Sequence, residues 1–383
     1  MDSKKVFLIR NVAPEKFGGG EVYQLELASK LRKAGFCPFI LTNSKELTKK
    51  AKEEGFFVLM PPYIKNQNWS GIKNLLLPVY FCRLMMLKKW YMNIFRRYMP
   101  DVVNIQSRDD FLAATFAAKK YGIRILWTDH ADFRNWVLWN VNKKFKNIIG
   151  KKIIKASMYT YGVIFVSKRV RAETNKLIFP WKVKNAITIE NGVRDRLGVY
   201  RDVKMKRQSF VYVGRIIEEK GVRDLIEAFG VVSKKFRDIR LNIYGSGEDL
   251  EKYKRLAKDA DEKIIFHGQT DKPLKALAEN EVFVLPSYKE GLSLSLLDAA
   301  MMGKTIIATD VDGNPEVVRD EETGLLVPPK NVIALAEAME RVLGDKKLAD
   351  NLGRAARKYY KENFDFDKIF DEKMLSLYNV EKE

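Results

Sequence analysis

The stretch VFVLPSYKEGLSLSLLDAAMMGKTIIATD, from Val282 to Asp310, holds an apolar run, a polar turn, a helical pattern and a second apolar run. Apolar runs that alternate with helical segments are typical of a parallel sheet covered on both faces. The turn carries the carboxylate of Glu290, and Asp298 follows eight residues later. A plain strand–helix connection needs no such pair, so the stretch indicates both a fold and a site.

The same alternation extends in both directions from this stretch. It runs from FVYVGR to GLLVP in the second half and from KVFLIR to AITIENGV in the first, with the polar segment YRDVKMKRQ between them. The length of 383 residues exceeds the usual size of a single core. We therefore predict an α/β fold of two doubly wound, Rossmann-like domains that face a central cleft.

The domain boundaries follow from these patterns. The first domain is predicted at residues 1–200 and the second at residues 201–360. Residues 361–383 are predicted to form a helix that crosses back to the first domain. The whole stretch from Val332 to Val380 has a helical pattern and is expected to be helical throughout.

The net charge of +20 indicates a polyanionic partner. Residues 61–100 contain no acid, and aromatic and basic residues are interleaved along them; a second basic tract spans residues 142–155 and follows FRNWVLW. The basic residues of the first tract are Lys65, Lys73, Arg83, Lys88, Lys89, Arg96 and Arg97, and its aromatic residues are Trp69, Tyr80, Phe81, Trp90, Tyr91, Phe95 and Tyr98. Such segments suit an anionic membrane surface better than nucleic acid. The alternative is a solvated basic helix that packs its aromatic residues inward.

Other features narrow the class of protein. No apolar run is long enough to span a membrane, and the N-terminus does not resemble a signal peptide. The two cysteines, Cys37 and Cys82, lie in apolar surroundings and are expected to be buried free thiols of a cytoplasmic protein, with a disulfide as the less supported alternative. Two Asp-x-Asp motifs, at 310–312 and 365–367, lack further ligand-type neighbours, so no metal site is predicted.

Several polar residues follow predicted strands or precede predicted helices. Gly18, Gly19 and Gly20 precede the first helix, where amides can approach a phosphate or a sugar, although a structural glycine turn explains them equally well. Their spacing is not the dinucleotide fingerprint. In the second half, Arg215 and Lys220 flank a turn in VGRIIEEKG and could neutralise a diphosphate; two exposed surface charges are the alternative.

The chain contains two histidines. His130 ends the predicted strand LWTDH, where an imidazole can bind a sugar hydroxyl or assist proton transfer. A purely structural histidine is the alternative. His267, in IIFHG, is the weaker candidate.

These segments, in this order, resemble the retaining nucleotide-sugar glycosyltransferases of family 4, whose two-domain fold is called GT-B. The resemblance is carried by GGGEVYQLELASKL, TDH, IENGV, VGRIIEEKG, YGSGE, IIFHG, LPSYKEGLSLSLLDAAMMGK, ATDVDGNPEVV and TGLLVPP. It covers nearly the whole chain and is more specific in the second half than in the first.

The resemblance implies roles for the residues of the second domain. Glu290 would hold hydroxyls of the transferred sugar, and the amides of Gly291, Leu292 and Ser293 would face the diphosphate. Arg215 and Lys220 would stabilise the charge that grows on the leaving nucleotide.

Other matched positions depart from the family or lie in the first domain. Asp298 would bind the nucleotide ribose, although the family usually has glutamate there. The family's glycine pair before Pro-Glu is altered in DGNPE, so Asp312 and Asn314 would change contacts to the sugar. In the first domain, Gly19 and Gly20 would approach the donor phosphate, and His130 would lie near the transferred sugar.

The implied reaction is hexosyl transfer with retention of configuration, from a UDP or GDP type of donor to a hydroxyl of a lipid-linked or glycan acceptor. The donor phosphate would accept the proton, so neither a protein base, a metal nor a cofactor is expected. The enzyme would act in the cytoplasm, at the inner face of the membrane, without a nucleic-acid partner; no pattern indicates an oligomeric state. The alternatives are a nucleotide-sugar epimerase or a phosphorylase of the same fold, and a basic peripheral membrane protein with a vestigial site.

Overall fold

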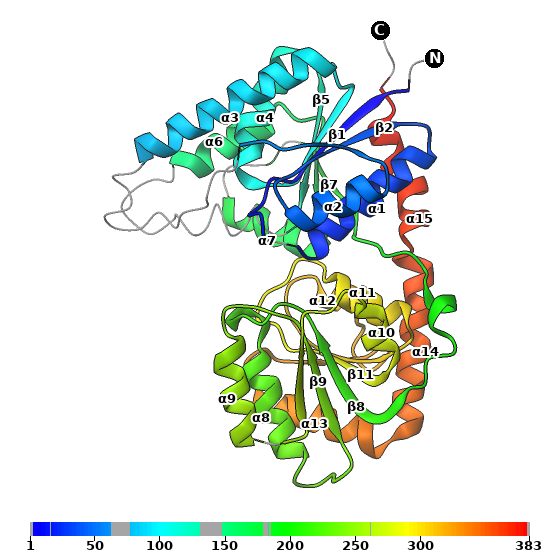
Figure 1. Cartoon of the computed structure of the whole chain (residues 1–383). Coiled ribbons are helices and arrows are strands. Elements are labelled where there is room, and N and C mark those ends of the chain that lie inside the picture. Colours follow the sequence, from blue (N-terminus) through cyan, green and yellow to red (C-terminus); the bar gives the residue numbers. More distant parts are fainter. Residues whose placement is uncertain are drawn as a thin grey trace. The chain divides into compact units, whose positions relative to one another are not determined.

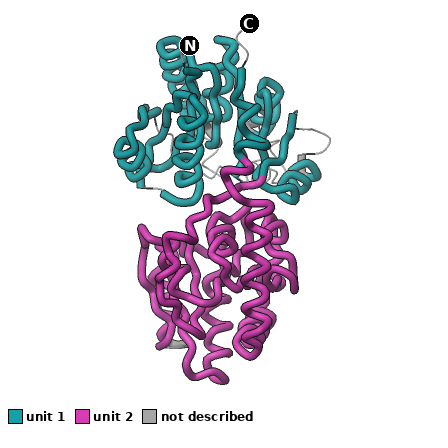
Figure 2. The backbone as a smooth tube through the Cα atoms, turned by 90° about the vertical axis from the view of Figure 1, so that its right-hand side faces the viewer, with its two compact units in different colours: residues 1–189, 370–383 teal, residues 190–369 magenta. Residues whose placement is uncertain are grey.

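The computed structural model describes residues 3–15, 17–62, 77–130, 148–178, 183, 185–260 and 262–380. They form two compact units: residues 1–189 with 370–383, and residues 190–369 (Figure 2). The chain thus leaves the first unit after Ile189 and returns to it at Phe370. Parts of both basic tracts, residues 63–76 and 142–147, lie outside the described residues, as does FRNWVLW.

The first unit contains a parallel sheet of seven strands in the order β3-β2-β1-β4-β5-β6-β7 (Figure 1). Its strands are β1 Lys5–Ile9, β2 Cys37–Leu41, β3 Phe57–Leu59, β4 Val102–Ile105, β5 Arg124–Asp129, β6 Gly162–Phe165 and β7 Ala186–Thr188. The central strands β1, β4 and β5 are almost fully buried, as their continuous apolar runs predict. The strand order reverses between β1 and β4, which defines the switch point of this sheet.

The helices of the first unit lie on both faces of this sheet (Figure 1). They are α1 Gly19–Lys33, α2 Lys45–Glu53, α3 Leu77–Tyr98, α4 Arg108–Lys120, α6 Ile148–Ser157 and α7 Lys168–Ile178. Ser44 caps α2 by accepting a hydrogen bond from the amide of Leu47. The helix α2 and the strand β3 were not predicted individually, although the apolar run FFVLM at residues 56–60 was a signal for β3.

Helix α3 shows where the aromatic residues in the described part of the first basic tract lie. The aromatic side chains of Tyr80, Tyr91 and Phe95 are buried in the core, whereas Met85 and Met86 are exposed. The aromatic residues of α3 therefore pack inward, as the second interpretation proposed. The exposed apolar residues of this helix are methionines and valine rather than aromatic residues.

The returning chain completes the first unit. A π-helical turn, η4 Phe370–Met374, leads into α16 Leu375–Tyr378. The buried hydroxyl of Tyr378 accepts a hydrogen bond of 2.6 Å from the Asn104 side chain on β4, and Arg124 on β5 donates to the carbonyl of Leu377. The helix α16 is thus anchored on the central strands of this sheet.

The second unit contains a parallel sheet of six strands in the order β10-β9-β8-β11-β12-β13. Its strands are β8 Lys206–Val213, β9 Arg240–Tyr244, β10 Ile264–Gly268, β11 Asn280–Leu285, β12 Thr305–Thr309 and β13 Leu325–Val327. Each matches a predicted strand, and the two sheets together confirm the predicted α/β fold of two Rossmann-like domains. The switch point lies between β8 and β11.

Helices surround the sheet of the second unit (Figure 1). They are α8 Val222–Val232, α9 Leu250–Ala260, α10 Pro273–Ala278, α11 Leu294–Met301, α12 Asn314–Val317, α13 Val332–Gly344, α14 Lys346–Asn363 and α15 Phe366–Ile369, with short 3-10 turns η2 Leu197–Tyr200 and η3 Glu218–Lys220. The expectation of one continuous helix from Val332 to Val380 is wrong. Asp345 and Asp365 interrupt it, since each side chain accepts from backbone amides at the start of the next helix.

The expectation that both cysteines are buried is also wrong. Both are free thiols, but Cys37 is half-buried and Cys82 is exposed. Cys82 lies on α3, whose outer face carries apolar residues, so apolar neighbours in the sequence did not imply burial. No helix within the described part of the chain is both long and apolar enough to cross a membrane.

Candidate functional site

The polar residues of the second unit gather at the switch point of its sheet. Arg215 and Lys220 follow β8, and Glu290 follows β11, the neighbouring strand. Ligands of open parallel sheets bind beyond the carboxyl ends of the strands at such a point. The topology therefore brings two cations and a carboxylate from distant parts of the sequence to one edge of the sheet.

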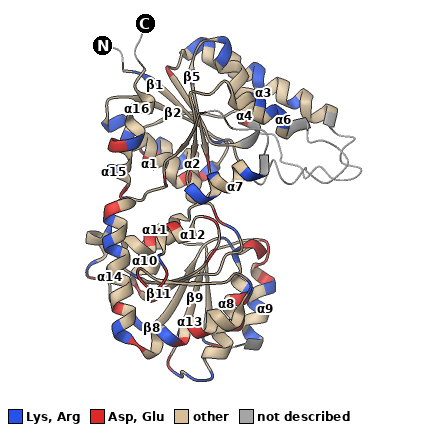
Figure 3. Ribbon diagram, turned by 180° about the vertical axis from the view of Figure 1, so that it is seen from behind, with Lys and Arg blue, Asp and Glu red and all other residues tan. Residues whose placement is uncertain are grey.

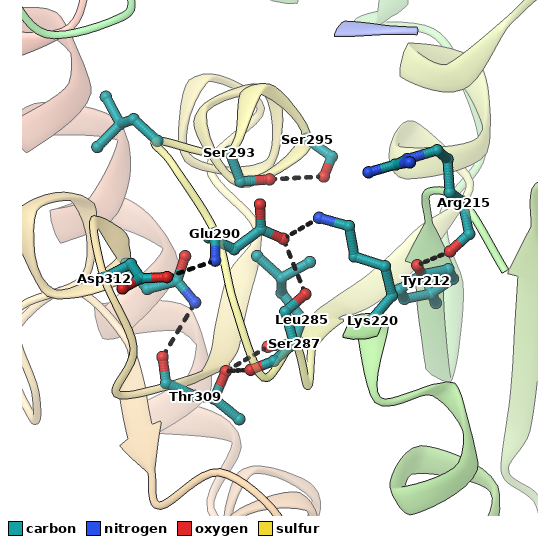
Figure 4. A network of polar contacts seen from close by, with 12 residues as sticks. Tyr212, Arg215, Lys220, Leu285, Ser287, Glu290, Ser293, Ser295, Thr309 and Asp312 are labelled. Carbon is teal, nitrogen blue, oxygen red and sulfur yellow. Dashed lines mark hydrogen bonds and ion pairs between the residues drawn. The ribbon is translucent and has the colours of Figure 1, made fainter. Parts of the chain in front are cut away.

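Glu290 is the centre of this group (Figure 4). Its Oε1 accepts a hydrogen bond of 2.5 Å from Lys220 Nζ and one of 2.8 Å from Ser287 Oγ. The side chain of Glu290 is 7% exposed and that of Lys220 is 16% exposed. The Coulomb attraction within an ion pair of such low exposure is stronger than within a surface pair. The two hydrogen-bond donors, Lys220 and Ser287, fix the direction of the Glu290 carboxylate.

The loop after β12 holds the Glu290 turn in place. Asp312 accepts a hydrogen bond of 2.8 Å from the amide of Glu290, and the amide of Gly313 donates to the carbonyl of Gly291 at 3.0 Å. A Cβ atom at Gly313 would lie 2.1 Å from that carbonyl oxygen, so only glycine fits. Asp312 has φ +45°, a conformation that aspartate tolerates better than most residues. Two residues further along the chain, the side-chain amide of Asn314 donates to the carbonyl of Thr309.

The turn after β8 lies equally close to the turn after β11. Gly221 directly precedes α8 and has φ +64°, and a Cβ atom there would lie 2.0 Å from the carbonyl oxygen of Pro286. The amide of Tyr288 donates to the carbonyl of Glu219 at 2.8 Å. These contacts dock the turn that carries Lys220 onto the turn that carries Glu290.

Arg215 lies on the same side of the site but is exposed. Figure 4 shows its side chain and that of Lys220 extending toward the turn that contains Glu290 and Ser293. The main chain of Arg215 is held by Tyr212, whose hydroxyl donates to its carbonyl at 2.6 Å. Burial and then the charge of Glu290 raise the pKa of Tyr212 above its usual range, so this donor stays neutral.

The remaining donor-site candidates lie at the start of α11. Gly291 and the buried Leu292 lead into Ser293, whose hydroxyl lies 3.0 Å from that of Ser295. The carbonyl of Leu292 accepts a hydrogen bond of 3.1 Å from the side-chain amide of the buried Asn191. Asp298 lies further along the same helix and is half-buried.

The candidate residues of the first unit lie at the switch point of its own sheet. Gly19 and Gly20 open α1, next to the buried ion pair of 2.6 Å between Arg10 and Glu21. A Cβ atom at Gly20 would lie 2.2 Å from the guanidinium of Arg10. The absence of a side chain at Gly20 therefore makes room for Arg10.

His130 follows β5 in this unit. Its Nε2 lies 3.2 Å from Oε1 of Gln106, and the ring of Tyr23 packs edge-on against the imidazole at 5.1 Å. Burial and then the charge of Arg10 lower the pKa of His130 well below its usual range. The imidazole is therefore neutral at physiological pH.

The motifs set aside in the sequence have structural roles. Asp312, of the first Asp-x-Asp motif, holds the Glu290 turn, and Asp365, of the second, caps α15. His267 bonds to Asn242 at 2.8 Å and stacks on Tyr244. Within the described ranges, no group of three histidine, cysteine or acidic residues is placed to hold a metal ion.

Sequence reasoning missed four residues of these clusters: Ser287, Arg10, Glu21 and Gln106. Arg10 and Gln106 each stand directly after an apolar strand, like His130. A polar residue in that position was the available signal. Glu21 gave none, because an acidic residue in the first turn of a helix is common.

Two family models match this chain. The model described as Glycosyltransferase Family 4 matches residues 17–196, and the model described as Glycosyl transferases group 1 matches residues 201–359. The two matches follow the two units of the fold.

Relatives and solved structures agree with these models. The capsular polysaccharide biosynthesis glycosyltransferase CapM of Staphylococcus aureus is 30% identical over 184 residues, which are 46% of this chain and 48% of the relative. An uncharacterized glycosyltransferase of Methanocaldococcus jannaschii is 28% identical over 324 residues, 75% of this chain and 77% of the relative. The match thus spans about half the length of the first relative.

Two solved structures share the fold over 98% of this chain. The Anabaena HepE protein in complex with UDP-glucose has a TM-score of 0.78 at 14% identity, with all of its chain covered, and a Staphylococcus aureus TarM variant has a TM-score of 0.77 at 16% identity, also with all of its chain covered. The N-terminal half of the chain thus matches the family 4 glycosyltransferase model and the C-terminal half the group 1 model, and the two-domain fold is that of GT-B glycosyltransferases.

Proposed function

We propose that the protein transfers a hexosyl unit from a nucleoside diphosphate sugar to a hydroxyl of a lipid-linked or glycan acceptor, with retention of configuration. The bond between C1 of the sugar and the β-phosphate oxygen breaks, and a bond from C1 to the acceptor oxygen forms on the same face. The acceptor proton passes to the departing phosphate. The single observation that carries the proposal is the Lys220–Glu290 pair at the switch point of the second sheet.

The cations of the site suit the leaving group. Lys220 and the exposed Arg215 can both reach a diphosphate placed over the start of α11, and the amides of Gly291 to Ser293 add positive potential there. Fixed positive charge stabilises the negative charge that develops as the bond to C1 breaks. These residues supply the charge that a metal ion would otherwise provide, so we propose metal-independent transfer.

Glu290 suits the sugar. Its Oε1 is occupied by Lys220 and Ser287, and its second oxygen can accept from hydroxyls of the transferred hexose. Asp298, on the same helix as the diphosphate-facing amides, is proposed to bind the ribose. In the first unit, His130 and the Gly19–Gly20 turn are proposed to face the transferred sugar and the donor phosphate.

The names of the relatives support the substrate classes. HepE was solved with UDP-glucose, the TarM variant was solved with UDP and a glycan, and CapM is named for capsular polysaccharide biosynthesis. We therefore favour a nucleotide-sugar donor, of the UDP or GDP type, and a glycan or lipid-linked glycan acceptor. An epimerase of the same fold would instead release the altered sugar without an acceptor.

A membrane surface is the proposed location of the acceptor. Helix α3 exposes Met85 and Met86, at 71% and 67%, beside exposed basic residues, and α6 lies next to it with Lys152 over the ring of Phe81 at 4.8 Å. Figure 3 shows Lys and Arg along both helices. The exposed basic residues are Arg83, Lys89, Arg96, Arg97, Lys151, Lys152 and Lys155. Methionines among lysines suit the headgroup region of the inner, anionic face of a bilayer.

The donor is tested by thermal shift of the purified protein with UDP-, GDP- and ADP-sugars in the presence of a chelator. Stabilisation by one nucleotide class is expected by mass action. Transfer to a synthetic lipid-linked acceptor, followed by NMR of the anomeric proton, then identifies the stereochemistry. An inverted product would refute retention, and loss of binding with chelator would refute metal independence.

The membrane surface is tested by sedimentation with anionic and neutral vesicles. Joint substitution of Met85→Ser and Met86→Ser is expected to weaken binding to anionic vesicles several-fold. Ile333→Ser, at a position 72% exposed in the second unit, is the matched control and should bind as the unaltered protein does. Equal binding by both variants would reject this surface.

A further inference from the structure

Gln106 occupies a central position in the first unit. It directly follows β4, one of the two strands that flank the switch point, and it is 2% exposed. Its main chain is fixed on one side by the amide, which donates to the carbonyl of Ile9 at 2.8 Å. Its carbonyl accepts from Arg10 Nη1 at 3.2 Å. The backbone of Gln106 is therefore locked to the end of β1.

The side chain of Gln106 reaches to the neighbouring strand. Its Oε1 lies 3.2 Å from Nε2 of His130, which follows β5. Its Nε2 is buried and has no hydrogen-bond partner within the described part of the chain. A buried amide nitrogen without a partner costs about 1–3 kcal/mol, so packing alone does not account for glutamine at this position.

The contact between Oε1 of Gln106 and Nε2 of His130 is a hydrogen bond in one tautomer of the neutral imidazole. A carboxamide oxygen only accepts hydrogen bonds, so the nitrogen that faces it must carry the proton. In a neutral imidazole the other nitrogen, Nδ1, then holds a lone pair. His130 is kept neutral by burial and by the charge of Arg10, which lower its pKa. Tyr23 packs against the imidazole, Glu21 is paired with Arg10, and Asp129 precedes His130 in the chain.

We propose that Gln106 is a positioning residue for His130: it holds the imidazole in the tautomer with hydrogen on Nε2, and so leaves Nδ1 as an acceptor for a substrate hydroxyl. This inference deepens the proposed function and rests on it for the identity of that hydroxyl. An imidazole in this state accepts a hydrogen bond from the hydroxyl and orients it, and the proton of the hydroxyl is not transferred to the histidine. That role agrees with a reaction in which the donor phosphate takes the proton.

The tautomer is measured by nitrogen NMR of the full chain labelled with ¹⁵N-histidine. The chain contains two histidines, and the variant His267→Gln leaves only the signals of His130. The expected result is one protonated nitrogen, Nε2, whose signal stays constant through neutral pH. A proton on Nδ1, or an imidazole that titrates near its ordinary pKa, would overturn the proposal.

Two substitutions change the acceptor in opposite ways. Gln106→Leu removes the oxygen and is expected to shift the tautomer toward Nδ1–H. Gln106→Glu keeps an acceptor and adds a negative charge, so the Nε2–H tautomer should persist and the pKa of His130 should rise. Gln24→Leu is the matched control, because Gln24 is a buried glutamine of the same unit whose side-chain oxygen has no hydrogen-bond partner among the described residues.

The outcomes separate a positioning role from a structural one. Signals of His130 that change in Gln106→Leu but not in Gln24→Leu support the proposal, and identical signals in all three proteins refute it. If Gln106→Leu does not fold, the unaltered protein and Gln106→Glu still decide the question. None of these measurements needs transfer activity, so a failure of the proposed function would be recognised separately.

Discussion

Each unit holds a cation–carboxylate pair of low exposure at the switch point of its sheet, but the two pairs are built differently. In the first unit, Arg10 and Glu21 are 11 residues apart in the sequence, and both side chains are at most 8% exposed. Arg10 also donates to the carbonyl of Gln106, and Gly20 makes room for its guanidinium. In the second unit, Lys220 and Glu290 are 70 residues apart, and the lysine is 16% exposed.

The difference distinguishes a structural pair from one that a ligand can enter. The rigid, planar guanidinium of Arg10 has fixed partners on two sides, and its carboxylate lies in the first turn of α1, where negative charge is stabilised. The ammonium of Lys220 has three donors and one carboxylate partner, so it can bind a phosphate oxygen while it keeps Glu290. The first pair therefore serves the fold, whereas the second has the freedom to bind that the proposed donor site requires.

The largest effect is expected from Glu290→Gln, which keeps the shape of the side chain and removes its charge. Lys220 loses its ion pair, and the sugar loses a charged acceptor. Transfer should fall by about 10³-fold, equivalent to about 4 kcal/mol, while the unfolding midpoint changes little. The initial rate of transfer with saturating donor measures this. Glu218→Gln, on the exposed turn before Lys220, is the control and should keep full activity.

The second prediction concerns stability rather than transfer activity, and here the larger effect is expected from the pair of the first unit. Arg10→Met leaves the carboxylate of Glu21 buried without its partner, which costs about 3–5 kcal/mol of stability. Lys220→Met should cost clearly less, because Glu290 keeps Ser287 as a donor and lies at a more exposed site. Urea unfolding of both variants compares the two costs. Equal losses would contradict the distinction between the pairs.

Gly20→Ala tests the Arg10–Glu21 pair by adding a methyl group next to the guanidinium of Arg10. Alanine has the higher helix propensity, yet its Cβ would lie 2.2 Å from the Arg10 guanidinium, so a loss of about 1–3 kcal/mol is expected. Gly344→Ala, where no atom lies within 4 Å of the added Cβ, is the control. In the Arg10→Met background the same Gly20→Ala change should cost nothing. A cost that persists there would show that Gly20 is needed for another reason.

The contrast between the two units also shows which features could be predicted from the sequence and which could not. The strands were predictable because buried parallel strands appear as continuous apolar runs, and Lys220 and Glu290 because they lie in turns next to such runs. The Arg10–Glu21 pair was not predicted, since the position of Arg10 after a strand marks it as a candidate but does not show that its side chain is buried and paired. Asp312 was noted only as a departure from the family, and its bond to the Glu290 amide depends on a loop conformation with positive φ.

A third cation of low exposure, Lys304, adds to the comparison because it forms no ion pair with a carboxylate among the described residues. Its Nζ donates to the carbonyls of Asn280 and Ala278, at 2.7 and 3.1 Å, and its side chain lies in the second unit at 7% exposure. Burial lowers its pKa to about 8, and the charge of Glu281 offsets this only in part. Carbonyl partners thus satisfy the ammonium but do not hold its proton as a carboxylate would.

The consequence is a stability that rises with pH. Native Lys304 releases its proton near pH 8, whereas the unfolded chain keeps it until about pH 10.4, so the unfolded state binds more protons between these values. The free energy of unfolding should therefore increase by about 1–2 kcal/mol from pH 8 to 9.5. Urea unfolding at several pH values measures the slope, and Lys304→Met should abolish this part of it. The same rise in the variant would assign the slope to other groups and leave Lys304 charged in the folded protein.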